Sequence, residues 1–399
     1  MLLQHNYAQH PGFRFEQAPL DVDSRSMEAF NEAYSEVEIY RERLARKEYR
    51  YCTSRCVDSL RAVFGTLRAQ TGDAHEALFL EELSREGERL LHDELRYLYL
   101  GGHEGGVTFT DQKTRERAMA LSSVRHYFGQ LPADTVREIT AVGADDLARF
   151  RQAATEGRTR REDLSSNSGA EVREIVAILN RDFHRQGVLD TLTSYMRRRM
   201  FVTGLALELS VPQAKWWASS YQSLPRPPRT LYAHLDESFA YPKAIVYLSK
   251  VEADNGPTSC YPGIYEGLTL HPLQAIVGRV LASVGSSESS PLHEYYAKQY
   301  HQSLSSERFR RHFMRLPPQL RFNSHFGWDV LPDSDIERSL VERERAMQGE
   351  AGTYVVFDGA RLLHRGGLLE RGERIVLQVV FSHVTLARRM GRRVKRFLR

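Results

Sequence analysis

The sequence predicts an α+β fold in which a mainly helical first part precedes a β-rich part. From about Ser26 to Arg151, apolar residues recur every three or four positions, which is the spacing of a helix with one buried face. Beyond about residue 200, short runs of β-branched and aromatic residues are bounded by Gly, Pro and Asp, as is typical of strands. Together these two patterns predict outer helices and a β-rich part that would carry a site.

Composition divides the chain into three regions. Residues 1–165 form the mainly helical region, and the segment 155–168 across its end is rich in charge and serine and is typical of a surface linker. Residues 166–383 would hold the β-rich core, and a basic tail, 384–399, follows. The tail repeats Leu386, Met390 and Val394 at helical spacing among arginines, so it predicts either an amphipathic helix on an anionic membrane surface or a terminal helix packed on the chain.

Within the second region we expect two helices before the first strand. Apolar spacing predicts helices from Ala170 to Arg185 and from Val188 to Met200, and the first core strand from Phe201 to Leu209. The following tryptophans, Trp216 and Trp217, with Tyr221, could line a pocket, but paired tryptophans more often pack in a core.

Two residues in one short segment give the first sign of chemistry. His234 and Asp236 stand two positions apart in a run that suits a strand and ends at Pro242. In a strand, such residues point to the same face, about 7 Å apart at the backbone, so both can bind one ion. Alone this H-x-D tripeptide is weak evidence, since most such tripeptides lie on surfaces.

A second histidine lies in the segment from Gly352 to Gly367. Thr353 to Phe357 predicts a strand, Asp358-Gly359 a turn, and the residues up to Leu363 a short strand that leads to His364. Gly366 and Gly367 would let the backbone pass close to a bound group. Two histidines and one carboxylate on one face of an iron leave positions open for a chelating co-substrate and dioxygen.

Arg374 opens the next predicted strand, which runs to Phe381. Alternation puts Arg374, Val376 and Gln378 on one face of that strand. An arginine that faces a metal pocket is costly to bury without an anion, and its planar fork matches a carboxylate in two-point contact. A structural salt bridge is the alternative for this residue.

These motifs together resemble the iron(II)- and 2-oxoglutarate-dependent dioxygenases, and among them the phytanoyl-CoA dioxygenase-like branch. The resemblance covers roughly residues 200 to 383, and it also rests on Tyr247-Leu248, Asn255-Gly256-Pro257-Thr258 and Tyr261-Pro262-Gly263. It implies a double-stranded β-helix core, which is a jelly-roll, cupin-like fold. Helices before the first core strand would then be outer packing, and a separate partner-binding domain is the alternative.

The resemblance also assigns roles to residues. His234, Asp236 and His364 would hold Fe(II), and Arg374 would bind the far carboxylate of 2-oxoglutarate. Tyr247 and Thr258 are candidates for a polar contact to its chelating end.

Three features depart from the family pattern. Gly366 stands where the family often has a hydroxyl residue, and the Pro-Gly-Ser-His ending reads Pro262-Gly263-Ile264-Tyr265. The gap between the two histidines is long, which implies an insertion at about 264–349. Its helical stretch from Pro291 to Met314 and the aromatic, polar run 322–329 predict either a lid over the pocket or a solvated decoration.

The activity implied by the resemblance is an oxygenase that consumes 2-oxoglutarate and O₂ and releases succinate and CO₂. It would hydroxylate an unactivated C–H bond of a small, carrier-linked, lipid-linked or glycan-linked metabolite. Asp236 favours hydroxylation, because related halogenases have a small residue there to make room for halide. Two alternatives are a cupin-like metalloenzyme without 2-oxoglutarate, such as an isomerase, and a non-enzymatic interaction protein on a β-helix scaffold.

Composition predicts a globular cytoplasmic protein. Of its 399 residues, 41% are hydrophobic and 27% charged, and no apolar run approaches the ~20 residues of a membrane helix. The net charge of +4 is too small to favour nucleic acid as a partner. Three cysteines, Cys52, Cys56 and Cys260, make no disulfide framework, and the first two are expected to pack as thiols.

Overall fold

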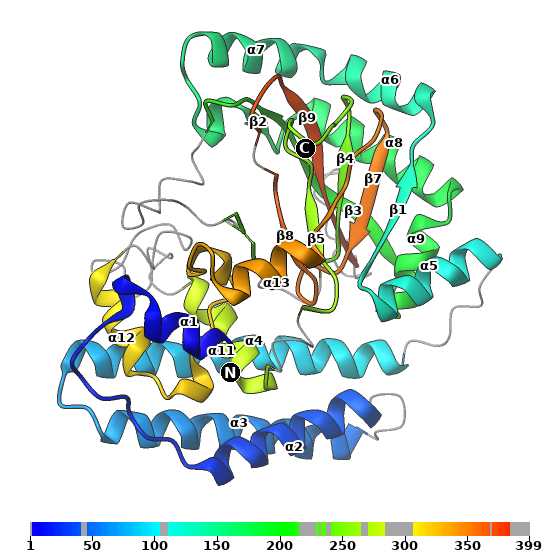
Figure 1. Cartoon of the computed structure of the whole chain (residues 1–399). Coiled ribbons are helices and arrows are strands. Elements are labelled where there is room, and N and C mark those ends of the chain that lie inside the picture. The colour runs from blue at the N-terminus through cyan, green and yellow to red at the C-terminus, as the bar shows by residue number, and fades with distance from the viewer. Residues whose placement is uncertain are drawn as a thin grey trace, which may run out of the picture.

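An antiparallel six-stranded sheet forms the centre of one half of the protein (Figure 1). The computed structural model describes residues 2–40, 46–103, 111–214, 229–230, 233–236, 241–264, 270–283, 306–367 and 369–383. The sheet has the order β1-β7-β4-β9-β3-β2. Its strands are β1 (His126–Gln130), β2 (Ser165–Ser166), β3 (Met200–Ser210), β4 (Lys243–Tyr247), β7 (Thr353–Phe357) and β9 (Arg374–His383).

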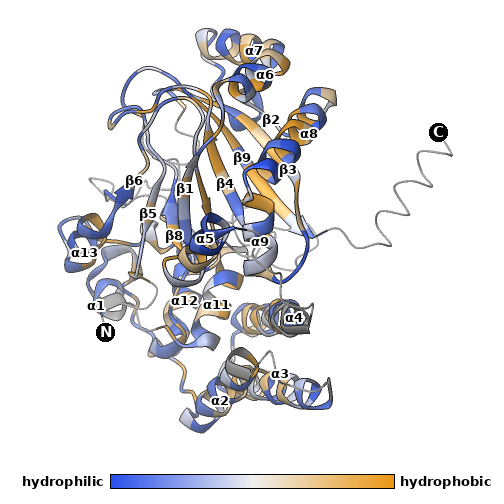
Figure 2. Cartoon of the chain, turned by 90° about the vertical axis from the view of Figure 1, so that its right-hand side faces the viewer, coloured by the Kyte–Doolittle hydropathy of each residue, from blue (hydrophilic) through white to orange (hydrophobic). Residues whose placement is uncertain are grey.

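Helices cover the outer face of this sheet. Apolar residues of α8 (Ala170–Arg185), such as Ile175 and Phe183, are buried in one cluster with Leu377 and Val379 of β9. Figure 2 shows the apolar colour concentrated on the strands beneath α8. The other helices on this side are α5 (Gln112–Ser123), α6 (Ala133–Val142), α7 (Ala144–Thr155) and α9 (Val188–Met196).

A second, three-stranded antiparallel sheet shares a small core with the inner face of the first. This sheet has the order β6-β5-β8, with β5 (Ser259–Tyr261), β6 (Arg345–Ala346) and β8 (Leu363–Arg365). Tyr247, Phe357 and Val376 of the large sheet are buried in one cluster with Cys260 and other residues on or beside the small sheet. Val376 lies in this cluster while its neighbours in β9 pack under α8, so the predicted alternation along that strand is confirmed.

A helical layer built from two distant parts of the sequence fills the other half of the protein (Figure 1). Its largest apolar side chains, such as Phe64 and Phe79, share a cluster with Phe309, Ile276 and other residues of the predicted insertion. The layer contains α1 (Leu2–Gln9), α2 (Ser24–Tyr40), α3 (Arg46–Ala69), α4 (Ala74–His103), α11 (Pro272–Ser283), α12 (Glu307–Arg315) and α13 (Asp335–Arg343). Tyr261 and Leu363 belong to the same cluster, so the layer packs on the small sheet. The described part of the insertion is therefore core, not solvated decoration.

Several expected elements are present where the sequence placed them, and others differ. Helix α8 and strand β7 have the expected bounds, while α9 ends at Met196, short of the predicted end at Met200. The strand predicted from Phe201 to Leu209 is confirmed as β3, which is one residue longer at each end, but an earlier strand was missed: β1 pairs with β7 at one edge of the sheet. Five residues between two helical stretches carry too short a pattern to reveal an edge strand. Part of the expected linker also forms a strand, β2, which pairs with β3.

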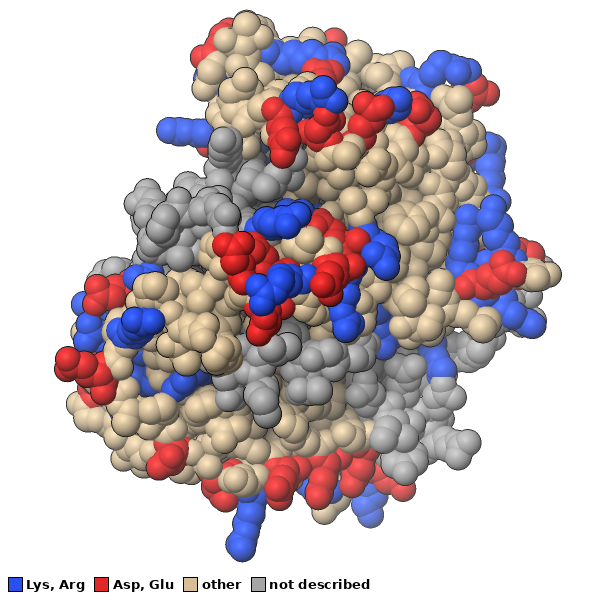
Figure 3. All heavy atoms as spheres, in the orientation of Figure 1, with Lys and Arg blue, Asp and Glu red and all other residues tan. Residues whose placement is uncertain are grey.

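Other expectations fall on residues outside the described ones. These are the tryptophans at 216 and 217 with Tyr221, Tyr265, the first part of the 291–314 helix, and the basic tail. No helix in the described part of the chain is both long and apolar enough to cross a membrane. On the face drawn in Figure 3, basic and acidic side chains are intermixed.

A buried carboxyl group ties the first helix to the helical layer and makes stability depend on pH. Burial raises the pKa of Asp329 from 3.8 to about 8, although the hydroxyl of Tyr7, 2.9 Å away, and the charge of Arg310 oppose the shift. An acid whose folded pKa is raised stabilises the fold below its unfolded pKa, and this contribution is lost as pH rises through the folded value.

We therefore expect the free energy of unfolding to gain more from Asp329→Asn at pH 8 than at pH 4. The amide resembles the neutral acid, so the gain at pH 8 should be at least about 1 kcal/mol. Urea unfolding followed by circular dichroism at the two pH values measures it. An equal effect at both would contradict the assignment.

Candidate metal centre

Three side chains distant in the sequence converge beside the small sheet. One ligand atom from each of His234, Asp236 and His364 lies within 4.8 Å of the others. The Nε2 atoms of both histidines lie 3.8 Å from Oδ1 of Asp236. All three side chains are almost fully buried, at 7 to 11% exposed. Two imidazoles and one carboxylate at these separations can bind a single metal ion, and within the described residues no other group of three such side chains has this geometry.

Backbone hydrogen bonds hold the three residues in place. His234 and His364 form an antiparallel bridge, with N···O distances of 2.9 and 3.1 Å. The amide of Asp236 donates to the carbonyl of Gly359 at 2.8 Å, and that of Leu235 to Ser324 at 2.8 Å. The residues around His234 described here thus form a single bridge, where the sequence indicated a strand. The side chains of His234 and Asp236 nevertheless reach the same point, as their spacing in the sequence predicted.

Gly359 leaves room for the carboxylate of Asp236. A Cβ at position 359 would lie 1.9 Å from Oδ2 and 2.7 Å from Cγ of Asp236, and 3.1 Å from Cε1 of His364. The turn therefore approaches two of the three candidate ligands as closely as glycine allows. Oδ2 of Asp236 is buried, and no hydrogen-bond donor among the described residues reaches it. A buried carboxylate oxygen without a donor is costly, and a metal ion would satisfy it.

The charges around Asp236 favour its ionised form. Burial opposes ionisation, but the ammonium of Lys243, whose Nζ lies 2.5 Å from Oδ1, and the two histidines outweigh it and hold the pKa of the carboxyl below its usual range. Burial lowers the pKa of His364, although Asp236 opposes this. A carboxylate and a neutral imidazole are the forms that bind a metal.

The ring of His364 has a fixed orientation. Its Nδ1 lies 2.9 Å from the carbonyl oxygen of Leu362, which can only accept, so Nδ1 carries the proton and Nε2 presents its lone pair. Phe357 packs against the ring, with centroids 4.7 Å apart. On the other histidine, the ring of the buried His325 stacks on that of His234 at 4.8 Å and 19°.

Arg374 is buried on the inner face of the large sheet, beside Tyr247. Its guanidinium donates to the carbonyl of Gly256 and, at 3.1 Å, to the hydroxyl of Ser210. Burial lowers its pKa, while Tyr247 and Glu208 act in the opposite direction. Within the described residues it forms no ion pair, and its buried Nε has no acceptor. The structural salt bridge considered as an alternative is therefore absent from this part of the chain.

The two residues predicted to contact the chelating end of a co-substrate have structural partners. The hydroxyl of Tyr247 accepts from the amide of Thr258 and donates to the carbonyl of Met347, both at 2.8 Å. Thr258 is buried beside it. Tyr247 thus joins β4 to the chain around β5 and β6, and a contact of either side chain with a co-substrate stays a prediction.

The two glycines after His364 differ from each other. A Cβ at Gly367 would lie 2.1 Å from the carbonyl oxygen of Pro257 and 2.3 Å from the carbonyl carbon of Gly256. The close approach expected at Gly367 is therefore an approach to the backbone of residues 256 and 257. At Gly366, nothing lies within 4 Å of the same position.

Three residues of the centre were not singled out from the sequence for the roles they have here: Lys243, Gly359 and His325. Gly359 was assigned only to a turn, and His325 only to an aromatic and polar run. Lys243 offered a signal, because it is a charged residue at the start of an apolar strand, one position after the proline that ends the H-x-D segment.

Comparisons with known proteins give weak similarities only. No protein-family model matches the chain, and no curated protein matches it. AviO1 from Streptomyces viridochromogenes Tue57 is 13% identical, with a TM-score of 0.36, and the match covers 69% of this chain and 96% of that one. EctD from S. alaskensis, crystallised with 2-oxoglutarate and 5-hydroxyectoine, is 12% identical with a TM-score of 0.36, covering 70% and 77%. The non-heme alpha ketoglutarate dependent epimerase SnoN from nogalamycin biosynthesis is 12% identical with a TM-score of 0.33, covering 68% and 84%. At these TM-scores the argument about this chain depends on its own residues.

Proposed function

We propose that this protein is an Fe(II)- and 2-oxoglutarate-dependent oxygenase that hydroxylates an unactivated C–H bond of a small, carrier-linked, lipid-linked or glycan-linked metabolite. The observation that carries the proposal is the convergence of His234, Asp236 and His364 on one point in a buried setting. We further propose that the two antiparallel sheets and their shared core are a double-stranded β-helix.

The residues fit the groups proposed for them. Asp236 has a buried oxygen to which no described residue donates, the ring of His364 is oriented to present Nε2, and Gly359 leaves room beside both side chains. When bound, iron with 2-oxoglutarate and dioxygen would supply the oxidising chemistry, with release of succinate and CO₂. The protein's part is to fix the ligand geometry and exclude water.

Arg374 fits the second carboxylate of 2-oxoglutarate. It is buried, carries a fixed positive charge, and has an Nε without an acceptor among the described residues. A carboxylate placed against this guanidinium would replace a costly desolvated cation by a charge-assisted pair. In the alternative without 2-oxoglutarate, the same arginine would bind an anionic substrate directly.

Anaerobic titration of the purified protein with Fe(II) and then 2-oxoglutarate tests the proposal. We expect a weak charge-transfer band on the order of 500 nm, and succinate release once oxygen is admitted. Iron binding without the band and without succinate would favour a metalloenzyme that uses no 2-oxoglutarate. No iron binding would favour an interaction protein.

Replacing Arg374 with methionine should weaken 2-oxoglutarate binding by at least about 100-fold and leave Fe(II) affinity nearly unchanged, because the loss is a buried charge-assisted pair. Arg321→Met is the matched control. Arg321 is equally buried and donates to the carbonyls of Leu316 and Met314 in the helical layer, and among the described residues its side chain bonds to none of the three candidate ligands. Calorimetric titration of both variants measures the two affinities. Equal loss of iron and 2-oxoglutarate binding in Arg374→Met would show that this residue supports the centre instead.

The substrate class and the location of the protein stay predictions. A lipid-linked substrate would suit the basic tail, 384–399, whose contact with an anionic membrane surface stays a prediction, as does a cytoplasmic location. Nucleic acid is not an expected partner.

A further inference from the structure

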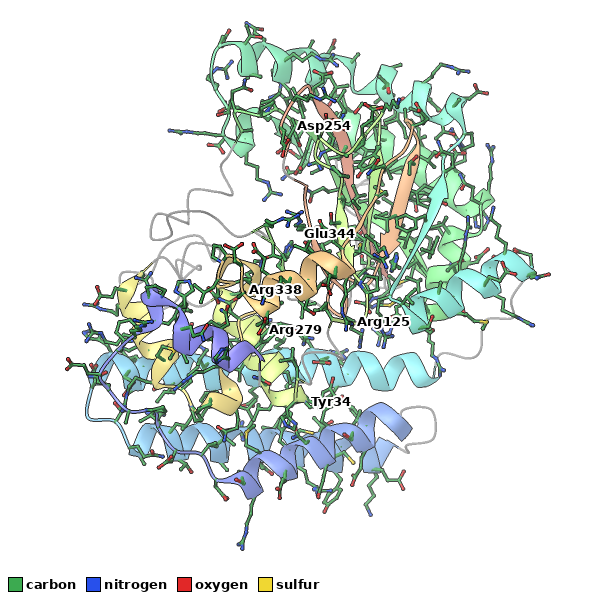
Figure 4. All side chains as sticks on the ribbon, viewed as in Figure 1. Tyr34, Arg125, Asp254, Arg279, Arg338 and Glu344 are labelled. Carbon is green, nitrogen blue, oxygen red and sulfur yellow. The ribbon has the colours of Figure 1, made fainter. Side chains whose placement is uncertain are left out.

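A buried ionic cluster lies between the helical layer and the β-rich half. At its centre is Glu94 of α4. Tyr34 of α2 donates a hydrogen bond to this carboxylate, and Arg279 of α11 forms an ion pair with it at 3.6 Å. The side chains of Arg279 and Glu94 are 2% and 1% exposed. In Figure 4, Tyr34 lies between α2 and α4 within the helical layer, and Arg279 lies on the side of α4 that faces the sheets.

The cluster continues into the turn formed by residues 358–361. Arg279 donates to the carbonyl of Ala360 at 3.3 Å. Arg361 binds Oδ2 of Asp358 at 2.7 Å, and the charges of Glu94 and Asp358 both act on its guanidinium. From the opposite side, Tyr195 of α9 donates to the same Asp358 oxygen at 2.6 Å.

This turn is the one that contacts the metal centre. The carbonyl of Gly359 accepts the amide of Asp236 at 2.8 Å, and its Cα lies against the carboxylate. The next residues lead to Leu362, whose carbonyl orients the ring of His364. A shift of the turn would therefore move two of the three candidate ligands at once.

The charges of Glu94 and Arg279 are buried, and each therefore depends on its partner. An ion at 1 to 2% exposure is tolerable only while its partner stays in place, so the helices and the turn hold each other in one arrangement. Groups that orient metal ligands from behind tune metal affinity even though they do not touch the ion.

We propose that Glu94 is a positioning residue for the metal centre. Through Arg279 and Arg361 it fixes the 358–361 turn, and with it Asp236 and His364, so that the helical layer sets the affinity of the centre for its metal. The inference rests on the proposed metal centre, and it is independent of the substrate and of 2-oxoglutarate.

The test compares two carboxylates on the same helix. Glu94→Gln removes the charge at the cluster, and Glu76→Gln removes the charge of a buried carboxylate that pairs with Arg315 at 2.8 Å, near the start of α4. The full-length apoprotein is titrated with Co(II) by calorimetry, and the visible spectrum of bound Co(II) reports the geometry of its ligands. We expect Glu94→Gln to raise the Kd for Co(II) about tenfold and to change the spectrum, and Glu76→Gln to leave both within about twofold of the unmodified protein.

The outcomes distinguish failure of the Glu94 inference from failure of the proposed metal centre. Equal Co(II) affinity and spectrum in the unmodified protein and Glu94→Gln would overturn the inference and leave the metal centre standing. Failure of the unmodified protein to bind Co(II) would remove the centre and the inference together. If Glu94→Gln does not fold, Tyr34→Phe and Tyr195→Phe take its place, because each removes a single hydroxyl from the cluster. Normal Co(II) binding by both would then overturn the inference.

Discussion

Alanine in place of Gly359 should abolish metal binding while most of the fold survives. The added methyl group would lie 1.9 Å from one oxygen of Asp236 and 2.7 Å from its Cγ, so the carboxylate must turn away from the histidines. Movement of the turn would not relieve the clash cheaply, because the Gly359 carbonyl holds the amide of Asp236. Overpacking of this kind costs about 1–3 kcal/mol of stability, whereas loss of a ligand removes the centre.

The matched control is alanine at Gly366, in the same segment on the other side of His364. Nothing lies within 4 Å of a Cβ there, and the residue does not have positive φ. Calorimetric titration with Fe(II) or Co(II) under anaerobic conditions compares the two variants. Tight binding by Gly359→Ala would mean that Asp236 is not a ligand in the position seen here.

Replacing Asp236 with alanine should raise the Kd for Fe(II) by at least about 100-fold. The variant removes the only carboxylate of the group and leaves Lys243 as an uncompensated positive charge beside the two histidines. That charge should repel the metal, which makes the loss larger than that of one ligand alone. Stability should change little, because the side chain of Lys243 is 31% exposed and can be hydrated.

Asp254→Ala serves as its control. Asp254 also pairs with a cationic residue, Arg371, but it belongs to no metal-binding group among the described residues. Figure 4 places Asp254 well apart from the helical layer. If both variants bound Fe(II) equally well, the three-ligand assignment would have to be abandoned.

The sequence predicted those parts of the fold in which local pattern and tertiary environment agree. Strand β9 alternates between two cores, so its periodicity is strict, and Arg374 falls on the inner face as expected. Helix α8 has one apolar stripe that meets the sheet, and its bounds were predicted correctly.

The parts that were missed depend on contacts between distant segments. The sequence of an amphipathic helix shows which face is buried but not which partner covers that face. It could therefore not be predicted that α3 and the insertion share one core. The same holds for the centre. His234, Asp236 and His364 carry chemistry in their side chains, whereas the importance of Gly359 comes only from the carboxylate that happens to lie above it.

The shared helical core has a consequence for how the chain reaches its native state. Helices α2 to α4 precede α11 and α12 in the chain, so the core in which Phe79 packs against Phe309 is completed only after residues 273–316 have been synthesised. During translation this apolar surface stays uncovered while some two hundred further residues are added, a delay that favours chaperone binding or aggregation. Cutting the chain near residue 165 would expose to water, in each fragment, the part of that interior which the other fragment covers.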